Sequence, residues 1–425
     1  MRTLAVDGPA RLLARPGVRA ALAALAVPGE ETRLVGGCVR DALLGIDAAD
    51  IDLATTLLPD AVAARGRAAG LKAIPTGIEH GTVTLIACGE PIEVTTLRED
   101  IATDGRHAIV RFGRDFRRDA ERRDFTVNAL FLGADGRLAD TVGGLADLEA
   151  GRVRFIGDAA TRLGEDALRI LRFFRFHARF GDGPPDPGGL AACIAARGAL
   201  ATLSRERVRA EFLKLLMAPG ARAAIDVLSE TGLLTRITGG VGEAGRLSRV
   251  AAAKAPAATR LAALAVATRD DAARLRKALR LSKAEHAALD GYARALAALK
   301  GRATIDARAL RALVAEHGTE AVGAALAATA GEPRPLIAAA ATAAWEALGN
   351  GPLPVLPVGG ADLVARGIPA GPRIGRALAA ARRLWLAEGC PAGPDATERL
   401  IALALASDRR TPPPEPTRDA DPGGP

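Results

Sequence analysis

The sequence predicts an α+β protein, in which a mixed sheet occupies the first third of the 425 residues and helices make up most of the rest. Two observations support this class. Between residues 33 and 150, short runs of apolar and β-branched residues alternate with turns, and few helices are expected. After Asp140 the spacing of apolar residues becomes helical and stays so almost to Ser407.

The individual elements follow from local patterns. An alanine-rich stretch at 1–32 predicts helix, ended by Pro28 and Gly29. Five runs then predict strands: RLVGG (33–37), IDLAT (51–55), TVTLIAC (82–88), PIEVTT (91–96) and FTVNALFLG (125–133). Segments rich in proline and glycine interrupt the helical part at 181–189, 239–245 and 349–360. The last segment, 411–425, holds six prolines, and we expect it to be disordered.

Two carboxylates one residue apart, Asp50 and Asp52 in DIDLATT, predict a metal site. If Ile51 and Leu53 face a core from a strand, the alternation of side chains places both carboxylates together on the opposite face. Mg²⁺ prefers oxygen ligands and is usually bound by one or two carboxylates together with substrate phosphates. For an isolated Asp-x-Asp, solvated strand or turn residues are the alternative.

The neighbouring segments supply further groups for a nucleotide. In LVGGCVRD, Gly36 and Gly37 let the backbone approach a triphosphate, and Arg40 adds a permanently charged donor. Glu93, in PIEVTT, is expected to point away from its buried neighbours on a second strand. Three carboxylates on neighbouring strands would form a two-metal site for the attack of a hydroxyl on a phosphate. An exposed strand glutamate is the alternative for Glu93.

The segment GEDALRILRFFRFHARF (164–180) predicts an amphipathic helix with an arginine-rich face. At about 100° per residue, one apolar stripe contains Ala167, Ile170, Leu171, Phe174 and Ala178. The other face contains Arg169, Arg172, Arg175 and Arg179 and starts beside Asp166. A solvated basic face is the alternative. Phe173 and Phe176 argue against it, because they project from the arginine face, where water would otherwise surround them.

Asp166 and Arg169 predict recognition of a base. Cytosine and adenine each present an amine donor beside a ring-nitrogen acceptor, whereas uracil and guanine present a carbonyl acceptor beside an N–H donor. A carboxylate can only accept and a guanidinium can only donate. One Asp and one Arg, one turn apart on a helix, thus match C and A and leave unpaired groups against U and G. Arg172 and Arg175, further along, are expected to face the sugar or the phosphates.

In this order and at these intervals, LVGGCVRDALLG, DIDLATT, IEVTT, RRDFTVNAL and EDALRILRFFRF resemble the class II tRNA nucleotidyltransferases, the CCA-adding enzymes and their poly(A) polymerase relatives. The resemblance covers about Arg33 to Leu216. It implies a nucleotidyltransferase-type mixed α/β head domain followed by an all-helical neck, body and tail. We expect these parts at 1–150 (catalytic head), 151–225 (neck, base selection), 226–348 (body) and 349–410 (tail, tRNA binding).

The resemblance also implies roles for particular residues. Asp166 and Arg169 fall on the family's base-recognising pair. Arg123 is expected to contact the nucleotide, and Asp124 and Asn128 are expected to tie the head to the neck.

Three further segments carry expectations. The stretch 97–113, with a turn at Asp104, Gly105 and Arg106, corresponds to a mobile loop of the family, and its presence favours addition of all three nucleotides. The helix at 204–216 carries three arginines, Arg205, Arg207 and Arg209, for which a structural role in the neck is expected rather than contact with RNA. Arginines in GIPAGPRIGRALAAARRLW of the tail could grip phosphates.

Composition agrees with a polyanionic partner, since the formal net charge is +8 and the pI is about 9.9. Other basic soluble proteins share this charge. Four scattered cysteines, Cys38, Cys88, Cys193 and Cys390, show no metal-ligand spacing and fit a reducing cytoplasm. No uncharged apolar run approaches the ~20 residues that a membrane span needs. We therefore expect a soluble, cytoplasmic protein.

The predicted activity is template-independent addition of C, C and A to the 3′ end of tRNA. CTP and ATP would be the substrates, with Mg²⁺ held by Asp50 and Asp52 and with Glu93 as a third acid. A poly(A) polymerase of the same family is one alternative, and product length separates the two. A catalytically silent RNA-binding protein is the other, and the intact acidic residues together with the Asp166 and Arg169 pair argue against it.

Overall fold

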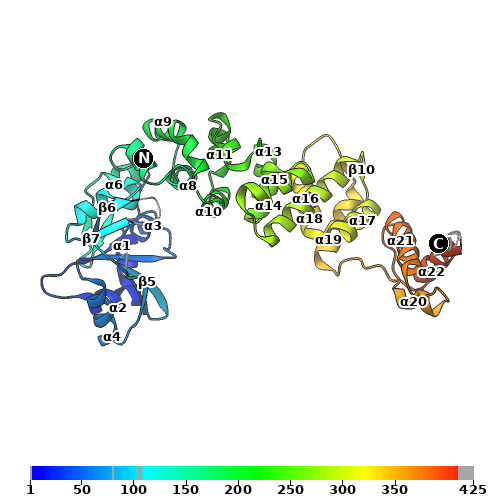
Figure 1. Ribbon diagram of the computed structural model, residues 1–425, viewed down its shortest axis with the longest axis horizontal. Coiled ribbons are helices and arrows are strands. Elements are labelled where there is room, and N and C mark those ends of the chain that lie inside the picture. Colours follow the sequence, from blue (N-terminus) through cyan, green and yellow to red (C-terminus); the bar gives the residue numbers. More distant parts are fainter. Residues whose placement is uncertain (1, 79–80, 104–107, 410–425) are drawn as a thin grey trace, which may run out of the picture. The chain divides into compact units, whose positions relative to one another are not determined.

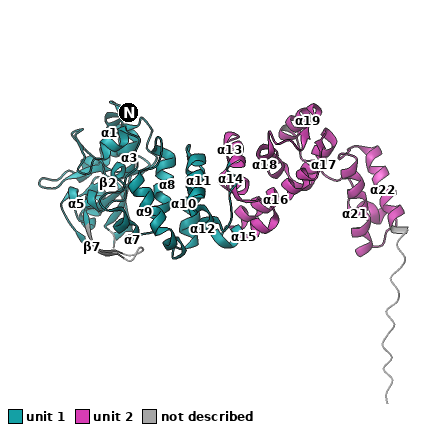
Figure 2. Cartoon of the chain, turned by 90° about the horizontal axis from the view of Figure 1, so that it is seen from above, with its two compact units in different colours: residues 1–244, 275–281 teal, residues 245–274, 282–425 magenta. Residues whose placement is uncertain are grey.

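The computed structural model describes residues 2–78, 81–103 and 108–409. The chain divides into two compact units: one contains the residues up to 244 together with 275–281, and the other contains 245–274 and the residues from 282 onward (Figure 2). The predicted head and neck lie in the first unit, and we keep these two names for its parts. The finer domain boundaries stay predictions. The segment expected to be disordered, 411–425, lies outside the described residues.

A seven-stranded mixed sheet forms the centre of the head, in the order β3-β4-β5-β2-β1-β8-β9 (Figure 1). Its strands are β1 (Thr32–Val35), β2 (Ile51–Thr55), β3 (Lys72–Gly77), β4 (Thr82–Ala87), β5 (Glu90–Thr96), β8 (Phe131–Gly133) and β9 (Leu138–Ala139). Among the described strands of this sheet, β2 and β5 are the pair that runs in parallel, and their register puts Asp52 opposite Glu93. The predicted mixed sheet is thereby confirmed.

Several strands were not expected from the sequence: β3, β9, and a separate hairpin of β6 (Arg98–Thr103) and β7 (Ala108–Phe112). The hairpin occupies the segment expected to be a loop, whose turn at Asp104, Gly105 and Arg106 lies outside the described residues. Within FTVNALFLG the strand prediction was mostly wrong, because Thr126–Asn128 form the 3₁₀ turn η2. Thr126 donates its N–H to the carbonyl oxygen of Arg154 (3.1 Å) and its hydroxyl to Asp147 (2.6 Å), which hold this part out of the sheet.

Two helices, α1 (Gly8–Ala14) and α2 (Pro16–Leu25), replace the single helix expected near the N-terminus. Arg15 between them has ψ 129°, because a residue that precedes proline is disfavoured in the helical region. Pro16 fits the first position of α2, where no N–H is needed. The other helices of the head are α3 (Gly37–Leu43), α4 (Pro59–Ala68), α5 (Phe116–Glu121) and α6 (Gly144–Glu149).

Helices form the rest of the first unit: α7 (Ala159–Glu165), α8 (Arg169–Phe180), α9 (Pro187–Ala195), the 3₁₀ helix η3 (Ala196–Ala201), α10 (Arg205–Leu216), α11 (Ala221–Glu230) and α12 (Leu233–Thr238). The apolar stripe predicted along α8 is buried, which confirms it. Phe173 and Phe176 are buried as well. The ring centroid of Phe173 lies 5.4 Å from that of Phe155, and the ring centroid of Phe176 lies 5.3 Å from that of Phe125. The arginine face of α8 therefore packs on the head instead of facing water on all sides.

The second unit is helical apart from a short parallel pair of strands, β10 (Thr304–Ile305) and β11 (Leu336–Ile337). From Ala244 onward the helices are α13 (Ala244–Ala252), α14 (Ala257–Ala265), α15 (Arg269–Leu279), α16 (Lys283–Lys300), α17 (Ala307–His317), α18 (Thr319–Thr329), α19 (Ala339–Asn350), α20 (Gly360–Ala365), α21 (Pro372–Ala387) and α22 (Pro394–Arg409). The last three pack around Trp385, Leu363 and Leu400, which are buried. None of the helices described in the chain has the length and apolar character needed to cross a bilayer.

Candidate active site

A cavity of about 620 Å³ opens in the first unit, between the head and helices α8 and α10. All of the site residues predicted from the sequence line it except Glu93: Gly36, Gly37, Arg40, Asp50, Asp52, Arg123, Asp166, Arg169, Arg172 and Arg175. Seven further residues, which sequence reasoning did not assign to the site, complete the lining: Arg122, Asp124, Asn128, Leu168, Phe176, Arg179 and Arg207. Acidic groups of the head thus share one cavity with the arginines of the neck.

The acidic wall of the cavity is formed at the start of β2, where Asp50 precedes the strand and Asp52 lies within it. Burial raises the pKa of Asp52 from 3.8 to about 6, the negative charges of Glu93 and Asp50 add to this, and Arg123 opposes it. Glu93 is exposed and does not line the cavity, although it is paired with Asp52 in the sheet. Within the described residues, no three His, Cys, Asp or Glu side chains are gathered as a set of metal ligands.

This arrangement fits a cation bound by two protein carboxylates better than one bound by three. Asp50 and Asp52 are oxygen donors of like charge at the cavity wall, and the charge of Asp50 adds to the burial that raises the pKa of Asp52. Mg²⁺ commonly takes one or two carboxylates and completes its shell with water and substrate phosphates.

The glycine turn before α3 brings the backbone close to the cavity. Gly36 has φ 73°, a conformation that strongly favours glycine. A Cβ atom at this position would lie 3.2 Å from the carbonyl oxygen of Asn128 and 3.3 Å from Nη1 of Arg123. The missing side chain of Gly36 therefore leaves room for the Arg123 guanidinium beside the turn.

Arg123 is held by Asp119 of α5, with Nε and Nη2 at 3.1 and 2.9 Å from Oδ2. Burial alone would raise the pKa of Asp119, but Arg123 and Arg122 outweigh it, so this pKa lies below its usual value. The Asp119 carboxylate stays ionised at neutral pH and keeps both arginines at the rim of the cavity.

Arg40 is placed differently from the expected free donor to a triphosphate. It is 5% exposed, and its guanidinium donates to Asp41 from Nε (2.8 Å) and Nη2 (2.6 Å) and to Asn128 from Nη1. Its Cζ atom lies 4.0 Å from the ring centroid of Phe180 on α8. These three hydrogen bonds stay within the head, and the contact with Phe180 connects Arg40 to the neck.

Asp124 ties the head to the neck, as the resemblance implied, whereas Asn128 contacts Asp124 and Arg40 within the head. Asp124 accepts two hydrogen bonds from Arg172 of α8, one of them 2.8 Å from Nε, and a third from Asn128 (3.1 Å). Burial would raise the pKa of Asp124, but Arg172 and the hydrogen bonds lower it below its usual value. Arg172 lines the cavity, yet its guanidinium is bound to this carboxylate.

Asp166 and Arg169, which were predicted to recognise the base, do not lie on one helix, so that part of the prediction was wrong. Asp166 is extended (φ −153°, ψ 105°) between α7 and α8, and Arg169 is the first residue of α8. The Oδ1 atom of Asp166 accepts the N–H of Leu168 at 3.0 Å, which favours an extended residue at the helix start over one more helical turn. Both side chains still reach the same cavity.

Both members of the pair have partners in the neck. Asp166 accepts a hydrogen bond at 2.6 Å from Nη2 of Arg207 on α10. Arg169 donates to Glu165 and, at 2.8 Å, to the carbonyl oxygen of Arg162. Sequence reasoning did not assign Arg207 to the site, because it lies 41 residues beyond Asp166 and no local pattern connects the two.

Arg175 and Phe176 form the remaining neck wall. Arg175 pairs with Glu211 of α10 at 2.5 Å, and its Cζ atom lies 4.2 Å from the ring centroid of Phe176. Burial lowers the pKa of Arg175, and Glu211 opposes this. Arg175 therefore faces the cavity with its charge partly balanced by the protein.

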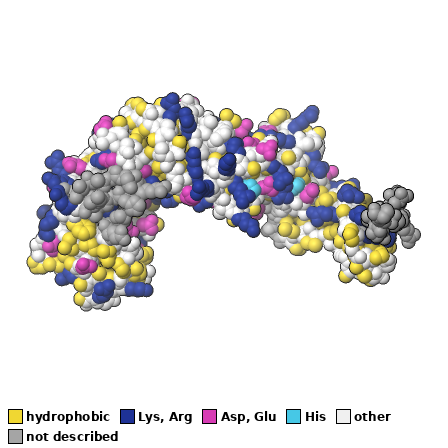
Figure 3. Space-filling model, in the orientation of Figure 1, with side chains coloured by type: hydrophobic (Ala, Val, Ile, Leu, Met, Phe, Trp, Pro, Cys, Tyr) yellow, Lys and Arg dark blue, Asp and Glu magenta, His cyan; other side chains and the backbone are white. Residues whose placement is uncertain are grey.

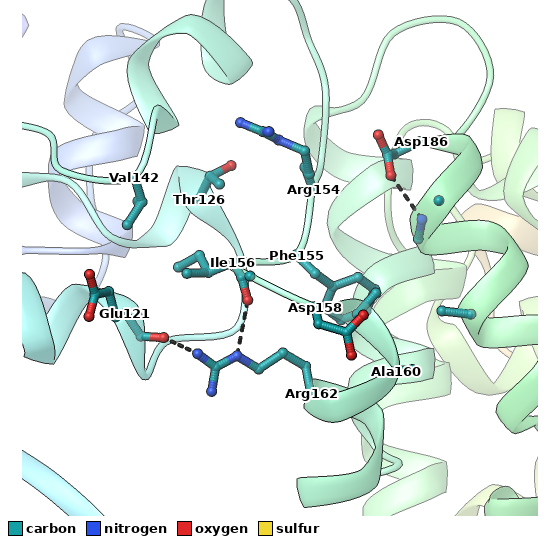
Figure 4. Close-up of a pocket in the computed structure, with 15 residues that line it drawn as sticks. Glu121, Thr126, Val142, Arg154, Phe155, Ile156, Asp158, Ala160, Arg162 and Asp186 are labelled. Atoms are coloured by element: carbon teal, nitrogen blue, oxygen red, sulfur yellow. Dashed lines mark hydrogen bonds between the residues drawn. The ribbon is translucent and has the colours of Figure 1, made fainter.

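A second cavity, of about 810 Å³, is lined by residues of α5, α7 and α9 and of the segment before α7 (Figure 4). Arg162 forms part of its wall and donates to the carbonyl oxygens of Glu121 and Ile156, the latter at 3.0 Å. The same guanidinium reaches Glu165 at 3.0 Å. Arg162 thus connects Glu165, the acidic partner of Arg169, to the backbone of the head at Glu121.

Comparisons with known proteins identify the family. The family model described as "Poly A polymerase head domain" matches residues 32–154, and the one described as "Probable RNA and SrmB- binding site of polymerase A" matches 186–238. The mitochondrial CCA tRNA nucleotidyltransferase 1 of Mus musculus is 38% identical over 276 residues, which is 63% of this chain and 64% of that protein. The CCA-adding enzyme of Limosilactobacillus fermentum is 32% identical over 356 residues, 82% of this chain and 87% of that protein.

A solved structure agrees with these relatives. The CCA-adding enzyme of Bacillus stearothermophilus, crystallised in complex with CTP, superposes with a TM-score of 0.71 at 29% identity, over 93% of this chain and 98% of that one. The chain belongs to the family of CCA-adding tRNA nucleotidyltransferases. The matched region spans less than two thirds of the length of the mouse relative.

Proposed function

We propose that this chain adds C, C and A to the 3′ end of tRNA, using CTP and ATP and releasing pyrophosphate. The observation that carries the proposal is the cavity that has Asp50 and Asp52 on its head wall and Asp166 and Arg169 on its neck wall. Chemistry and base recognition would then take place on one bound nucleotide. The B. stearothermophilus relative, which shares the fold, was crystallised with CTP.

Asp50 and Asp52 would hold Mg²⁺, with the charge of Glu93 nearby in the adjacent strand. The chemistry supplied by bound Mg²⁺ is activation of the terminal 3′ hydroxyl and neutralisation of the α-phosphate and the leaving pyrophosphate. The hydroxyl oxygen then attacks the α-phosphorus, and the bond to the pyrophosphate breaks.

Other groups of the head would position the triphosphate. The turn at Gly36 and Gly37 leaves the backbone accessible at the cavity wall. Arg123, which Asp119 fixes at the rim, would donate to phosphate oxygens in a planar fork. Arg40 and Arg172 would contribute positive charge close by while their hydrogen bonds hold Asp41 and Asp124 in place.

Asp166 and Arg169 would select the base. The Asp166 carboxylate would accept from the exocyclic amine of C or A, and the Arg169 guanidinium would donate to the ring nitrogen. Uracil or guanine would leave buried polar groups unpaired, which costs several kcal/mol and supports discrimination of roughly 10⁴. The protein would thereby replace a nucleic-acid template.

The tRNA itself would be held outside this cavity. The net charge of +8 favours a polyanionic ligand, and Lys and Arg side chains are visible on the surface of both units (Figure 3). Helix α21 begins after Gly371 and carries Arg373, Arg376, Arg382 and Arg383, a suitable set for phosphate contacts. A tRNA held at its acceptor arm would stop growing once the cavity is full.

The β6–β7 hairpin would take part in the change from adding C to adding A. It stands where the resemblance places the mobile loop and lies next to β5 in the chain. Its presence supports addition of the full CCA sequence over a product that ends at CC. The cytoplasmic location expected from the cysteines stays a prediction.

An assay with purified protein tests the proposal. A tRNA that lacks its 3′ CCA is incubated with each of the four nucleotides singly and with all of them together. CTP alone should add two residues, CTP with ATP should add three, and UTP or GTP should add none. An Asp50→Asn variant should add nothing and still bind tRNA, because phosphate contacts lie elsewhere. Long A tracts from ATP alone would indicate a poly(A) polymerase, and tRNA binding without any addition would indicate a silent RNA-binding protein.

A further inference from the structure

The orientation of the Asp166 carboxylate depends on a residue outside the base-recognising pair. Asp166 lies in an extended linker between α7 and α8, and from this segment its carboxylate accepts the N–H of Leu168 on Oδ1. That bond leaves the other oxygen free to move as the side chain rotates. Arg207 of α10 fixes it by donating to Oδ2 at 2.6 Å.

Arg207 is itself held by the packing of α10. Val208 and Phe212, its neighbours on that helix, are fully buried, and α10 packs along α8. One turn further along α10, Glu211 pairs with Arg175 of α8 at 2.5 Å. Arg207 and Glu211 therefore form two charged bridges on the cavity side of α10, one to Asp166 at the start of α8 and one to the helix itself.

From this geometry we infer that Arg207 is a positioning residue for base selection, which acts by fixing the plane of the Asp166 carboxylate. The inference rests on the proposed function. The two oxygens of Asp166 are each bound once by the protein, so each keeps capacity to accept from an incoming base. With its plane fixed, the carboxylate meets the amine of C or A in one geometry. Without Arg207 it can turn and accept from a different donor, including the N–H of U or G.

This role predicts a loss of selectivity that differs from a loss of activity. Asp50, Asp52 and Arg123 belong to the head, whereas Arg207 belongs to α10 and contacts Asp166, so the choice of nucleotide should change more than the rate with CTP. Misalignment of one charge-assisted hydrogen bond is worth roughly a factor of ten. We expect Arg207→Gln to raise the ratio of kcat/KM for UTP to that for CTP roughly tenfold.

The test uses the full chain, tRNA lacking CCA, and steady-state kinetics with CTP and UTP. Arg209→Gln is the matched control: Arg209 lies on the same helix, is accessible to solvent, and donates to the backbone of Arg280 at 2.6 Å, so the nucleotide ratio should stay at the wild-type value. Arg207→Lys keeps the charge and loses the planar fork, so its ratio should fall between wild type and Arg207→Gln. If Arg207→Gln does not fold, a wild-type ratio in Arg207→Lys overturns the inference.

A double-mutant cycle separates action through Asp166 from a structural role. In an Asp166→Ala background, Arg207→Gln should leave the nucleotide ratio unchanged, because the group it positions is gone. Equal slowing with CTP and UTP, or an Arg207 effect that persists without Asp166, would show that Arg207 only supports helix packing. Failure of the proposed function would be seen separately, as a wild-type chain that adds neither C nor A.

Discussion

Replacing Asp52 with asparagine should stabilise the metal-free head while abolishing nucleotide addition. Burial, followed by the charges of Glu93 and Asp50, raises the pKa of Asp52 from 3.8 to about 6. At about 1.4 kcal/mol for each pKa unit, keeping this carboxylate ionised in the folded head costs about 3 kcal/mol. Asparagine has nearly the same shape and no charge, so it removes this cost together with the metal ligand.

The sign of the pH dependence follows from linkage. A carboxyl whose pKa is raised in the folded state binds its proton more tightly there, so the unfolding free energy is highest below the ordinary pKa and falls as pH rises through the raised one. The advantage of Asp52→Asn over wild type should be complete well above pH 6 and shrink as the pH falls toward 4. Added Mg²⁺ should stabilise the wild-type head and leave the variant unchanged.

The assay must observe the head, because both tryptophans, Trp345 and Trp385, and the single tyrosine, Tyr292, belong to the second unit. Hydrogen exchange of peptides from β2 and β5, followed by mass spectrometry in chelator at pH 8, reports head opening directly. Tryptophan fluorescence then serves as an internal reference for the second unit. Asp47→Asn, an exposed head residue outside the cavity, is the matched control and should change stability by less than about 0.5 kcal/mol. Faster or unchanged exchange in Asp52→Asn at pH 8 would refute the argument that the ionised carboxylate of Asp52 destabilises the folded head.

Three further outcomes are expected. Asp124→Ala should destabilise the first unit by about 3 kcal/mol, because it leaves Arg172 without its buried partner. In wild type, the stabilisation by this pair should vanish only as the pH falls through the lowered pKa of Asp124. Hydrogen exchange of α8 at neutral and acidic pH measures both effects, and unchanged exchange would contradict the role of Asp124 in holding α8 to the head. Phe173→Ala should lower the unfolding free energy of the first unit by about 3–5 kcal/mol in the same measurement, since the ring is fully buried against Phe155. A loss below about 1 kcal/mol would mean that the surrounding aromatic side chains repack. Removal of the tail from Gly349 should weaken tRNA binding in a filter assay and reduce the salt dependence of that binding. Removal of 411–425 should change neither. An equal loss of tRNA binding in both truncated proteins would place the RNA contacts at 411–425 instead.

Residues that carry chemistry within a short motif could be predicted from the sequence. Asp50 and Asp52 were placed by the alternation of one strand, and Asp166 and Arg169 by what a carboxylate and a guanidinium can accept and donate. All four line one cavity. The position of Glu93 opposite Asp52 required knowing that β5 pairs with β2 in parallel, and its exposure outside the cavity could not be seen from strand alternation alone.

The long-range partners of the arginines could not be predicted. Arg40, Arg172 and Arg175 read from the sequence as free donors for phosphate, but each is bound to a carboxylate that comes from a separate part of the fold or from the adjacent residue. A row of arginines on one face of a helix does not predict which carboxylate each arginine will pair with in the folded protein. The pairing of Arg207 with Asp166 across 41 residues is the same case.

The prediction of local conformation was wrong where tertiary contacts or a side-chain hydrogen bond determined the backbone. The run Phe125 to Gly133 is apolar throughout and could be a strand by composition. Contacts of Thr126 with Asp147 and Arg154 turn its first half into a 3₁₀ turn. Asp166 was assigned to a helix by periodicity, although its own side chain bonds the backbone of Leu168 and starts the helix later.

Addition to a tRNA that already ends in CC tests the central claim most directly. The protein is incubated with this tRNA and ATP alone, and the product mass is measured over time at saturating enzyme. If Asp166 and Arg169 recognise the base in a cavity of fixed size while the acceptor arm is held elsewhere, one A is added and growth stops. Continued addition of A, or no addition while the same preparation extends a tRNA lacking CCA with CTP, would contradict this account.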